Sequence, residues 1–161
     1  MFRVGFGYDA HKFVLGRKCI LCGVEIPCEF GPDGHSDADV PVHALMDALL
    51  GALALGDIGK HFPDTDESFS GADSISLLSH VYALIRKNNY ALSNADITMV
   101  MEKPRIASYV DQMRETIATA LNIDLNQISI KGTTEEKMGF TGEGLGMKSY
   151  AVVLLNKIAN N

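Results

Sequence analysis

The sequence predicts a single-domain α+β sandwich over residues 1–161, in which a mixed β-sheet is covered by helices on one face. The length of 161 residues fits one domain. Segments with strand-like and helix-like patterns follow one another without internal repeats or linkers. Hydrophobic residues make up 47% of the chain and charged residues 21%, which is typical of a packed core rather than of a disordered chain.

The first third of the chain is expected to form three strands and then a helix. The strands cover residues 3–9, 18–21 and 24–26, and a loop rich in Gly, Pro and Asp spans residues 29–37. Apolar residues then recur at the spacing of one buried helical face: Val42, Leu45, Met46, Leu49, Leu50 and Leu53. We expect Asp39 to cap this helix and Gly56 to mark its end.

The rest of the chain is expected to add two helices and three strands. Residues 57–71 form a polar loop. The helices run from about residue 73 to 87 and from about 105 to 121, and the strands cover 95–102, 127–131 and 147–157. The run of residues 151–155 is apolar throughout, which predicts burial on both faces of the sheet.

Charge and composition exclude several classes of protein. A net charge of −6 argues against general nucleic-acid binding, so any bound phosphate needs a metal, a few cations or backbone N–H groups. No segment approaches the roughly 18 apolar residues of a membrane helix, and the N-terminus lacks a secretory pattern, so we expect a cytoplasmic protein. Cys19, Cys22 and Cys28 are too few and too clustered for a disulfide framework; small buried hairpin residues are favoured over a zinc or redox site.

A candidate metal site begins at the end of the first strand. Asp9 and His11 are alternate residues of an extended chain and therefore share a face. His43, near the start of the first helix, could supply a third ligand and leave an open position, as in a catalytic zinc site. Asp47 lies one turn after His43 and could orient it, or simply interact with solvent.

Three other polar segments allow a structural and a functional interpretation. Residues 35–39 suit turn and capping chemistry, although His35 could donate to a phosphate or act as a general acid. Residues 57–66 could form a substrate loop or an ordinary surface connection. Thr133 and Glu136 fit a capping box, or a phosphate-binding strand end with Glu136 on a metal. The glycine-rich run 139–146 lacks the end of a P-loop.

Taken together, these segments resemble a known enzyme family. Residues 7–11, 35–44, 47–52, 55–66 and 139–144 are similar, in order and without a large insertion, to the 2-C-methyl-D-erythritol 2,4-cyclodiphosphate synthases of the non-mevalonate isoprenoid pathway. The resemblance implies conversion of 4-diphosphocytidyl-2-C-methyl-D-erythritol 2-phosphate to the cyclic diphosphate with release of CMP. It also implies a homotrimer with active sites between neighbouring subunits.

The resemblance assigns roles to individual residues. Asp9, His11 and His43 match the family's zinc ligands, and Glu136 matches the ligand of a magnesium or manganese ion that bridges the substrate diphosphate. His35 and Thr134 match the residues that stabilise the transition state. The matched substrate contacts are Asp9, Ala10, His11, His35, Ser36, Asp57, Ile58, Gly59, Phe62, Pro63, Asp64, Thr65, Asp66, Met101, Pro104, Arg105, Ile106, Ala107, Thr133, Thr134, Glu135, Glu136, Phe140 and Glu143.

One departure from the family pattern concerns the centre of the implied trimer. Glu143 stands where several members carry Arg, and an acid there would repel an isoprenoid diphosphate in the central cavity. Two other functions stay open from the residues alone. One is a metal-dependent hydrolase that uses the same three ligands and a bound water. The other is a nucleotide-binding module without turnover.

Overall fold

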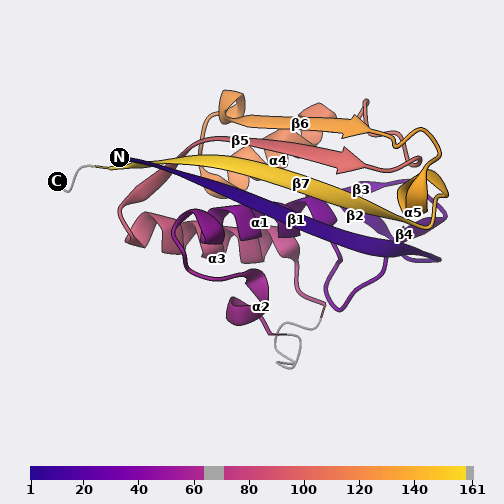
Figure 1. Ribbon diagram of the computed structural model, residues 1–161, viewed down its shortest axis with the longest axis horizontal. Coiled ribbons are helices and arrows are strands. Elements are labelled where there is room, and N and C mark those ends of the chain that lie inside the picture. Colours follow the sequence, from indigo (N-terminus) through magenta and orange to yellow (C-terminus); the bar gives the residue numbers. More distant parts are fainter. Residues whose placement is uncertain (64–70, 159–161) are drawn as a thin grey trace.

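The computed structural model describes residues 1–63 and 71–158. Its main sheet has five strands in the order β4–β1–β7–β5–β6 (Figure 1). Strand β1 (Phe2–Leu15) pairs antiparallel with β4 (Phe30–Pro32) and with β7 (Gly146–Lys157). Strand β5 (Tyr90–Val100) is antiparallel to β7 and parallel to β6 (Ile128–Thr133). The expected mixed sheet is therefore confirmed.

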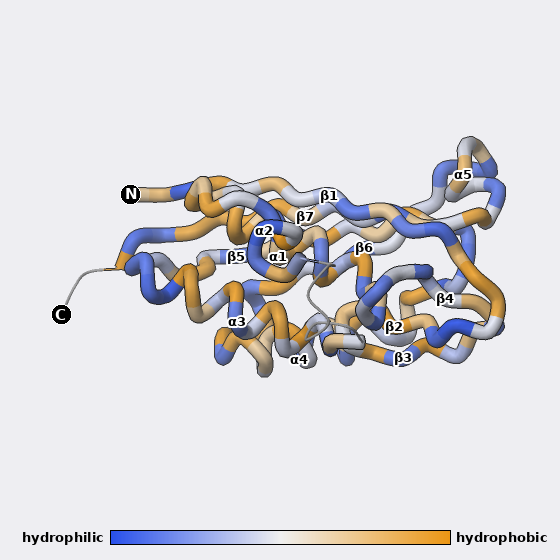
Figure 2. The backbone as a smooth tube through the Cα atoms, turned by 90° about the horizontal axis from the view of Figure 1, so that it is seen from below, coloured by the Kyte–Doolittle hydropathy of each residue, from blue (hydrophilic) through white to orange (hydrophobic). Residues whose placement is uncertain are grey.

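Three helices cover one face of this sheet (Figures 1 and 2). They are α1 (Val40–Ala52), α3 (Ser74–Lys87) and α4 (Val110–Leu121). Two one-turn helices, α2 (Ile58–His61) and α5 (Gly139–Gly142), and a 3-10 turn at Leu125–Gln127 lie in the connections. Within the described residues, no helix is both long enough and apolar enough to cross a membrane.

Helix α1 lies unusually close to β1 because two glycines of the strand face it. A Cβ atom on Gly5 would lie 1.8 Å from the carbonyl oxygen of Ala48, and one on Gly7 would lie 1.9 Å from that of Ala44. Only glycine on the strand and small side chains on the helix allow this approach. The close packing brings the N-terminal end of α1 next to the middle of β1.

The N-terminus of α1 is fixed by the buried side chain of Asp39. Its carboxylate accepts the N–H groups of Val42 in the helix, and of Cys22 and Gly23 between β2 (Cys19–Leu21) and β3 (Val24–Ile26). The predicted cap is thus confirmed, and it also joins the small β2–β3 hairpin to the helix. Cys19 and Cys22 are buried and unbridged, as expected, and burial raises the pKa of Cys19 to about 12.

Several predicted boundaries were wrong. Strand β1 continues six residues beyond Asp9, because it pairs with β4, which lies inside the predicted loop 29–37. Strand β5 starts at Tyr90 rather than at residue 95, and α4 starts at Val110 rather than near residue 105. Ile106 nevertheless enters the core, from the turns that precede α4. Helix α1 ends at Ala52, before Gly56.

The outer face of the sheet, away from the helices, is apolar and exposed. On β1 the alternate side chains Phe2, Val4, Phe6 and Tyr8 are between 46% and 69% exposed. On β7, Val152 is 45% exposed, whereas its neighbours Ala151 and Val153 are fully buried. The prediction that residues 151–155 are buried on both faces is therefore wrong for the single chain, since helices cover only one face.

Candidate metal centre

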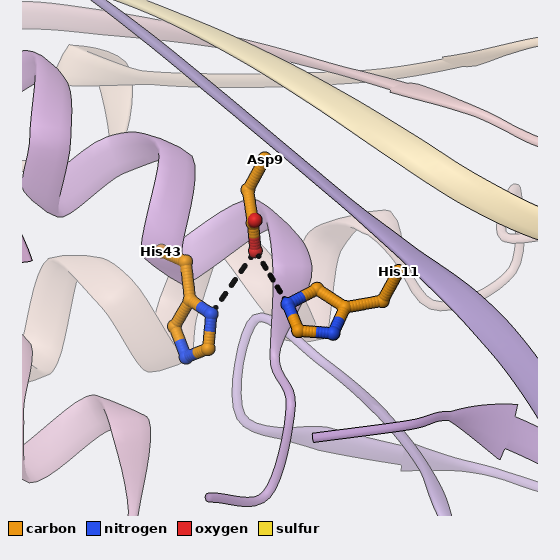
Figure 3. Close-up of side chains that lie close together, drawn as sticks. All are labelled: Asp9, His11 and His43. Atoms are coloured by element: carbon orange, nitrogen blue, oxygen red, sulfur yellow. Dashed lines mark hydrogen bonds and ion pairs between the residues drawn. The ribbon is translucent and has the colours of Figure 1, made fainter. Parts of the chain in front are cut away.

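Asp9, His11 and His43 converge at the point where α1 meets β1 (Figure 3). One ligand atom from each lies within 4.8 Å of the other two. Oδ2 of Asp9 is 3.0 Å from Nδ1 of His43 and 3.1 Å from Nε2 of His11. Asp9 and His11 share the face of β1 that carries Gly5 and Gly7, as their spacing predicted, and the glycines bring His43 within reach.

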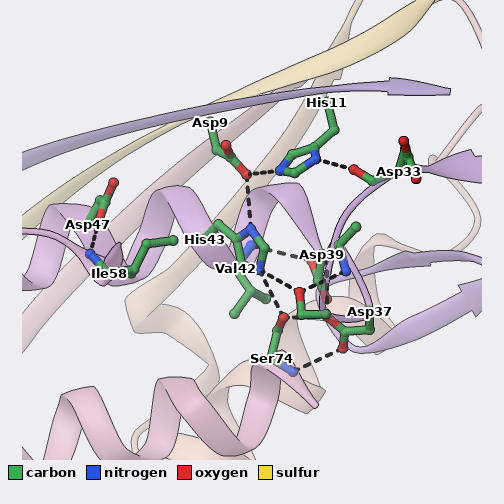
Figure 4. Close-up of polar contacts among 12 residues, drawn as sticks. Asp9, His11, Asp33, Asp37, Asp39, Val42, His43, Asp47, Ile58 and Ser74 are labelled. Carbon is green, nitrogen blue, oxygen red and sulfur yellow. Dashed lines mark hydrogen bonds and ion pairs between the residues drawn. The ribbon is translucent and has the colours of Figure 1, made fainter. Parts of the chain in front are cut away.

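Each imidazole is oriented by its second ring nitrogen (Figure 4). Nδ1 of His11 donates to the backbone carbonyl of Asp33, because a carbonyl can only accept. Nε2 of His43 lies 3.1 Å from the hydroxyl of Ser74, which donates its own proton to Asp37 and therefore accepts from His43. The remaining nitrogens, Nε2 of His11 and Nδ1 of His43, both face Asp9, and they are the two nitrogens that a metal beside Asp9 would take as ligands.

The charges at this site favour a cation. Burial opposes ionisation of Asp9, but hydrogen bonds from His11 and His43 outweigh it and lower the pKa of Asp9 to about 2. The hydrogen bond to Asp9 raises the pKa of His11 above its usual value, against the effect of burial. One carboxylate and two imidazoles with exposed space beside them match the three-ligand sets of catalytic zinc sites, so the donor set fits a divalent metal.

Asp47 does not orient His43, contrary to one interpretation of its spacing. Its carboxylate accepts the backbone N–H of Ile58 at 2.8 Å and so fixes the start of α2 (Figure 4). Asp57 caps the same turn by accepting from the backbone N–H of Lys60 at 3.0 Å. The first part of the predicted substrate loop is thus anchored to α1, the helix that carries His43. Asp64, Thr65 and Asp66 lie outside the described residues.

The loop before α1 combines structural and site residues. Asp37 and Asp39 serve turn and cap chemistry, which confirms the structural interpretation for both. Ser36 reaches the metal centre, with its hydroxyl 3.4 Å from Nε2 of His43. The side chain of His35 is exposed, and its backbone carbonyl accepts from Gly71. Its catalytic role stays a prediction.

A second region lies at the ends of β5 and β6. A pocket of about 540 Å³ is lined by Met101, Pro104, Arg105, Ile106 and Ala107, all predicted substrate contacts, together with Thr133 and Thr134. The turn that follows carries Glu135 and Glu136. No helix starts here, so the capping box predicted from Thr133 and Glu136 is wrong; instead, the backbone N–H of Glu136 donates to the hydroxyl of Thr134.

Within the described residues of one chain, no hydrogen bond or ion pair links this second region to the metal centre.

Sequence patterns also missed three residues that hold the site. Asp33 and Ser74 orient the histidines, and Lys148 pairs with Glu135. Each acts through a contact more than ten positions away, so local spacing carried no signal for them.

Comparison with known proteins extends this picture. Residues 2–156 match the YgbB family. A 2-C-methyl-D-erythritol 2,4-cyclodiphosphate synthase from Clostridium perfringens is 59% identical over 155 residues, which cover 96% of this chain and 99% of the relative. One from Lachnospira eligens is 56% identical over 158 residues, 98% of this chain and 86% of the relative.

Solved structures with the same fold support this family relationship. The bifunctional IspDF from Campylobacter jejuni has a TM-score of 0.95 and 39% identity, with 98% of this chain matched to 43% of that larger one. The CDP complex of IspF from Plasmodium falciparum has a TM-score of 0.87 and 36% identity, with 98% and 97% of the two chains covered.

The fold, the Asp-His-His donor set and these likenesses define a cyclising phosphorus–oxygen lyase. The chain belongs to the YgbB family of 2-C-methyl-D-erythritol 2,4-cyclodiphosphate synthases, enzymes of isoprenoid biosynthesis.

Proposed function

We propose that this chain converts 4-diphosphocytidyl-2-C-methyl-D-erythritol 2-phosphate to 2-C-methyl-D-erythritol 2,4-cyclodiphosphate and CMP. An oxygen of the 2-phosphate attacks the β-phosphorus of the same molecule, and the bond from that phosphorus to the oxygen it shares with the α-phosphate breaks as CMP leaves. The observation that carries the proposal is the convergence of Asp9, His11 and His43 in a chain of this family.

The residues of the chain act mainly by placing the two phosphates and by stabilising charge, because the reaction is intramolecular. Asp9, His11 and His43 hold zinc, and Glu136 holds magnesium or manganese; these ions supply positive charge to the phosphate oxygens. His35 and Thr134 donate hydrogen bonds to the transferring phosphate. The role of the imidazole tautomers is to keep one lone pair of each ring available to the metal.

The two ends of the substrate are assigned to two different regions of the chain. The loop that starts at Asp57 holds the methylerythritol part, and the pocket lined by Met101 and Pro104–Ala107 holds the cytidine. Ala10, Ser36, Glu135, Phe140 and Glu143 complete the proposed contacts. Because no hydrogen bond or ion pair among residues 1–63 and 71–158 joins the metal centre to the pocket, a neighbouring subunit is expected to bring them together.

A homotrimer would supply that neighbour. The apolar outer face of the sheet supports assembly, because exposed Phe2, Val4 and Phe6 are unusual on a monomer surface. In such a trimer the outer face would be buried and the active sites would lie between subunits. Glu143, which is exposed next to α5, is expected to disfavour an anionic ligand at the trimer centre. The sequence also leads us to expect a cytoplasmic location.

Phosphorus NMR of the purified protein with the cytidyl substrate and magnesium tests the proposal. Cyclic diphosphate and free CMP are expected. Linear methylerythritol phosphates would show a hydrolase instead, and unchanged substrate would point to a binding module. In parallel, the variant His11→Ala should lose bound zinc and most of its turnover, while His80→Ala, an exposed histidine on α3, should lose neither. Full zinc occupancy in His11→Ala would contradict the metal assignment.

A further inference from the structure

The turn after β6 has a backbone conformation that needs external support. Glu136 and Lys137 have φ values of 52° and 65°, in the left-handed region that residues with a Cβ rarely adopt. Inside the turn, the hydroxyl of Thr134 accepts the N–H of Glu136 at a long 3.3 Å. Such a conformation persists when the surrounding structure holds it in place. The contacts around Glu135 and Lys137 provide that support.

Lys148 on β7 makes one of these contacts. Its Nζ lies 2.6 Å from Oε1 of Glu135, and the other carboxylate oxygen of Glu135 accepts the hydroxyl of buried Thr141 at 2.5 Å. Nζ also lies 5.8 Å from the ring centroid of Phe140 and 5.9 Å from that of Tyr150. The Lys148 side chain is 15% exposed and that of Glu135 is 34% exposed, so the pair is only partly shielded from solvent.

The other side of the turn is held separately. Oε1 of Glu102 accepts the backbone N–H of Lys137 at 3.1 Å, and the N–H of Met138 donates to the carbonyl of Glu135 at 2.9 Å. Glu135 lies between Thr134 and Glu136, the two residues assigned to the transferring phosphate and the second metal. The position of the Glu135 side chain therefore limits where both of its neighbours can lie.

We propose that Lys148 is a positioning residue for the cyclisation: by fixing Glu135 against the sheet, it sets the geometry of the turn that presents Thr134 and Glu136. This inference rests on the proposed function. It assigns Lys148 no contact with substrate, so its effect should reach the reaction only through the turn.

The variant Lys148→Met keeps the length of the aliphatic chain and removes the ammonium group. We expect its kcat to fall about 10- to 100-fold, since small displacements of catalytic groups have effects of this size, while KM changes little. Lys18→Met is the matched control. It breaks an ion pair with Glu25 in the β2–β3 hairpin, with side chains 70% and 56% exposed, and should keep wild-type kinetics. Lys148→Arg retains a cation for Glu135 and should restore most of the lost kcat.

Hydrogen exchange gives a readout that does not depend on turnover. The amides of Lys137 and Met138 should exchange about tenfold faster or more in Lys148→Met, and at the wild-type rate in Lys18→Met. Unchanged protection of these amides in Lys148→Met would overturn the proposal, as would wild-type kcat in that variant. If the wild-type protein formed no cyclic product, the proposed function would fail, and the exchange rates would still decide whether Lys148 holds the turn.

Discussion

The hydroxyl oxygen of Ser74, in the first turn of α3, lies 3.1 Å from Nε2 of His43 on α1. Ser74 is fully buried, and the carboxylate of Asp37 accepts both its hydroxyl and its backbone N–H. The hydroxyl is therefore committed as a donor to Asp37 and as an acceptor from His43. This chain of contacts fixes the tautomer of His43, a candidate metal ligand on α1, from a different helix.

Removal of this contact should weaken metal binding without removing a ligand. Ser74→Ala is expected to lower zinc affinity about 10- to 100-fold, as measured by competition with a chromophoric chelator. Ser79→Ala, one turn further along α3, removes a hydroxyl that bonds to backbone carbonyls and should leave the affinity unchanged. Equal affinities for Ser74→Ala and the wild type would show that His43 is oriented by other contacts.

Zinc affinity should also depend on pH in a defined direction. The hydrogen bond to Asp9 raises the pKa of His11 above 6.5, so the metal-free protein keeps this ring protonated to higher pH than a free histidine. Zinc must displace that proton, and its affinity should therefore fall as pH decreases below the raised pKa of His11. Calorimetric titrations in buffers of different ionisation enthalpy should detect proton release on binding. A pH-independent affinity between pH 6 and 8 would contradict this coupling.

Asp47 should affect the substrate rather than the metal. In Asp47→Ala the backbone N–H of Ile58 loses its charged acceptor, and the start of the substrate loop loses its link to α1. A hydrogen bond to a charged group contributes about 1.5–3 kcal/mol, so KM is expected to rise about tenfold or more. Zinc content should remain that of the wild type. Loss of zinc instead would indicate that Asp47 supports His43 after all.

The glycines of β1 should be intolerant of any side chain. In Gly7→Ala the new Cβ would meet the backbone of Ala44, and we expect unfolding in urea to show a loss of about 2–3 kcal/mol or more. Gly51→Ala offers a contrast on α1 itself, because the nearest atom to its Cβ would be 4.0 Å away. That variant should be as stable as the wild type or about 0.5–1 kcal/mol more stable, from helix propensity.

Assembly should depend on the apolar outer face. Light scattering of the wild type is expected to give about three times the chain mass of 17.4 kDa. Phe6→Glu places a charge among the exposed side chains of β1 and should give a folded monomer with little turnover. Leu125→Glu, at an exposed apolar residue in the 3-10 turn, should remain assembled and active. An active monomer of either protein would contradict active sites shared between subunits.

Much of the fold could be predicted because its signals are local. The helical spacing between Val42 and Leu50, the cap at Asp39 and the alternation at Asp9 and His11 depend on residues a few positions apart. Strand β4 could not be predicted, because its three residues are defined by pairing with the far end of β1. The exposure of Val152 could not be predicted either, since an apolar run does not show which face of its strand a helix covers.

The sequence by itself determined which residues can act as ligands, and through its motif set it identified the family. Only the tertiary structure decided how those ligands are held. Asp33 and Ser74 reach the histidines across 22 and 31 positions, and Lys148 reaches Glu135 across 13. Such contacts form when packing brings distant segments together, here through two glycines that let α1 lie directly on β1. Periodicity and spacing describe only neighbours along the chain, so the orientation of the metal ligands is a property of the folded protein alone.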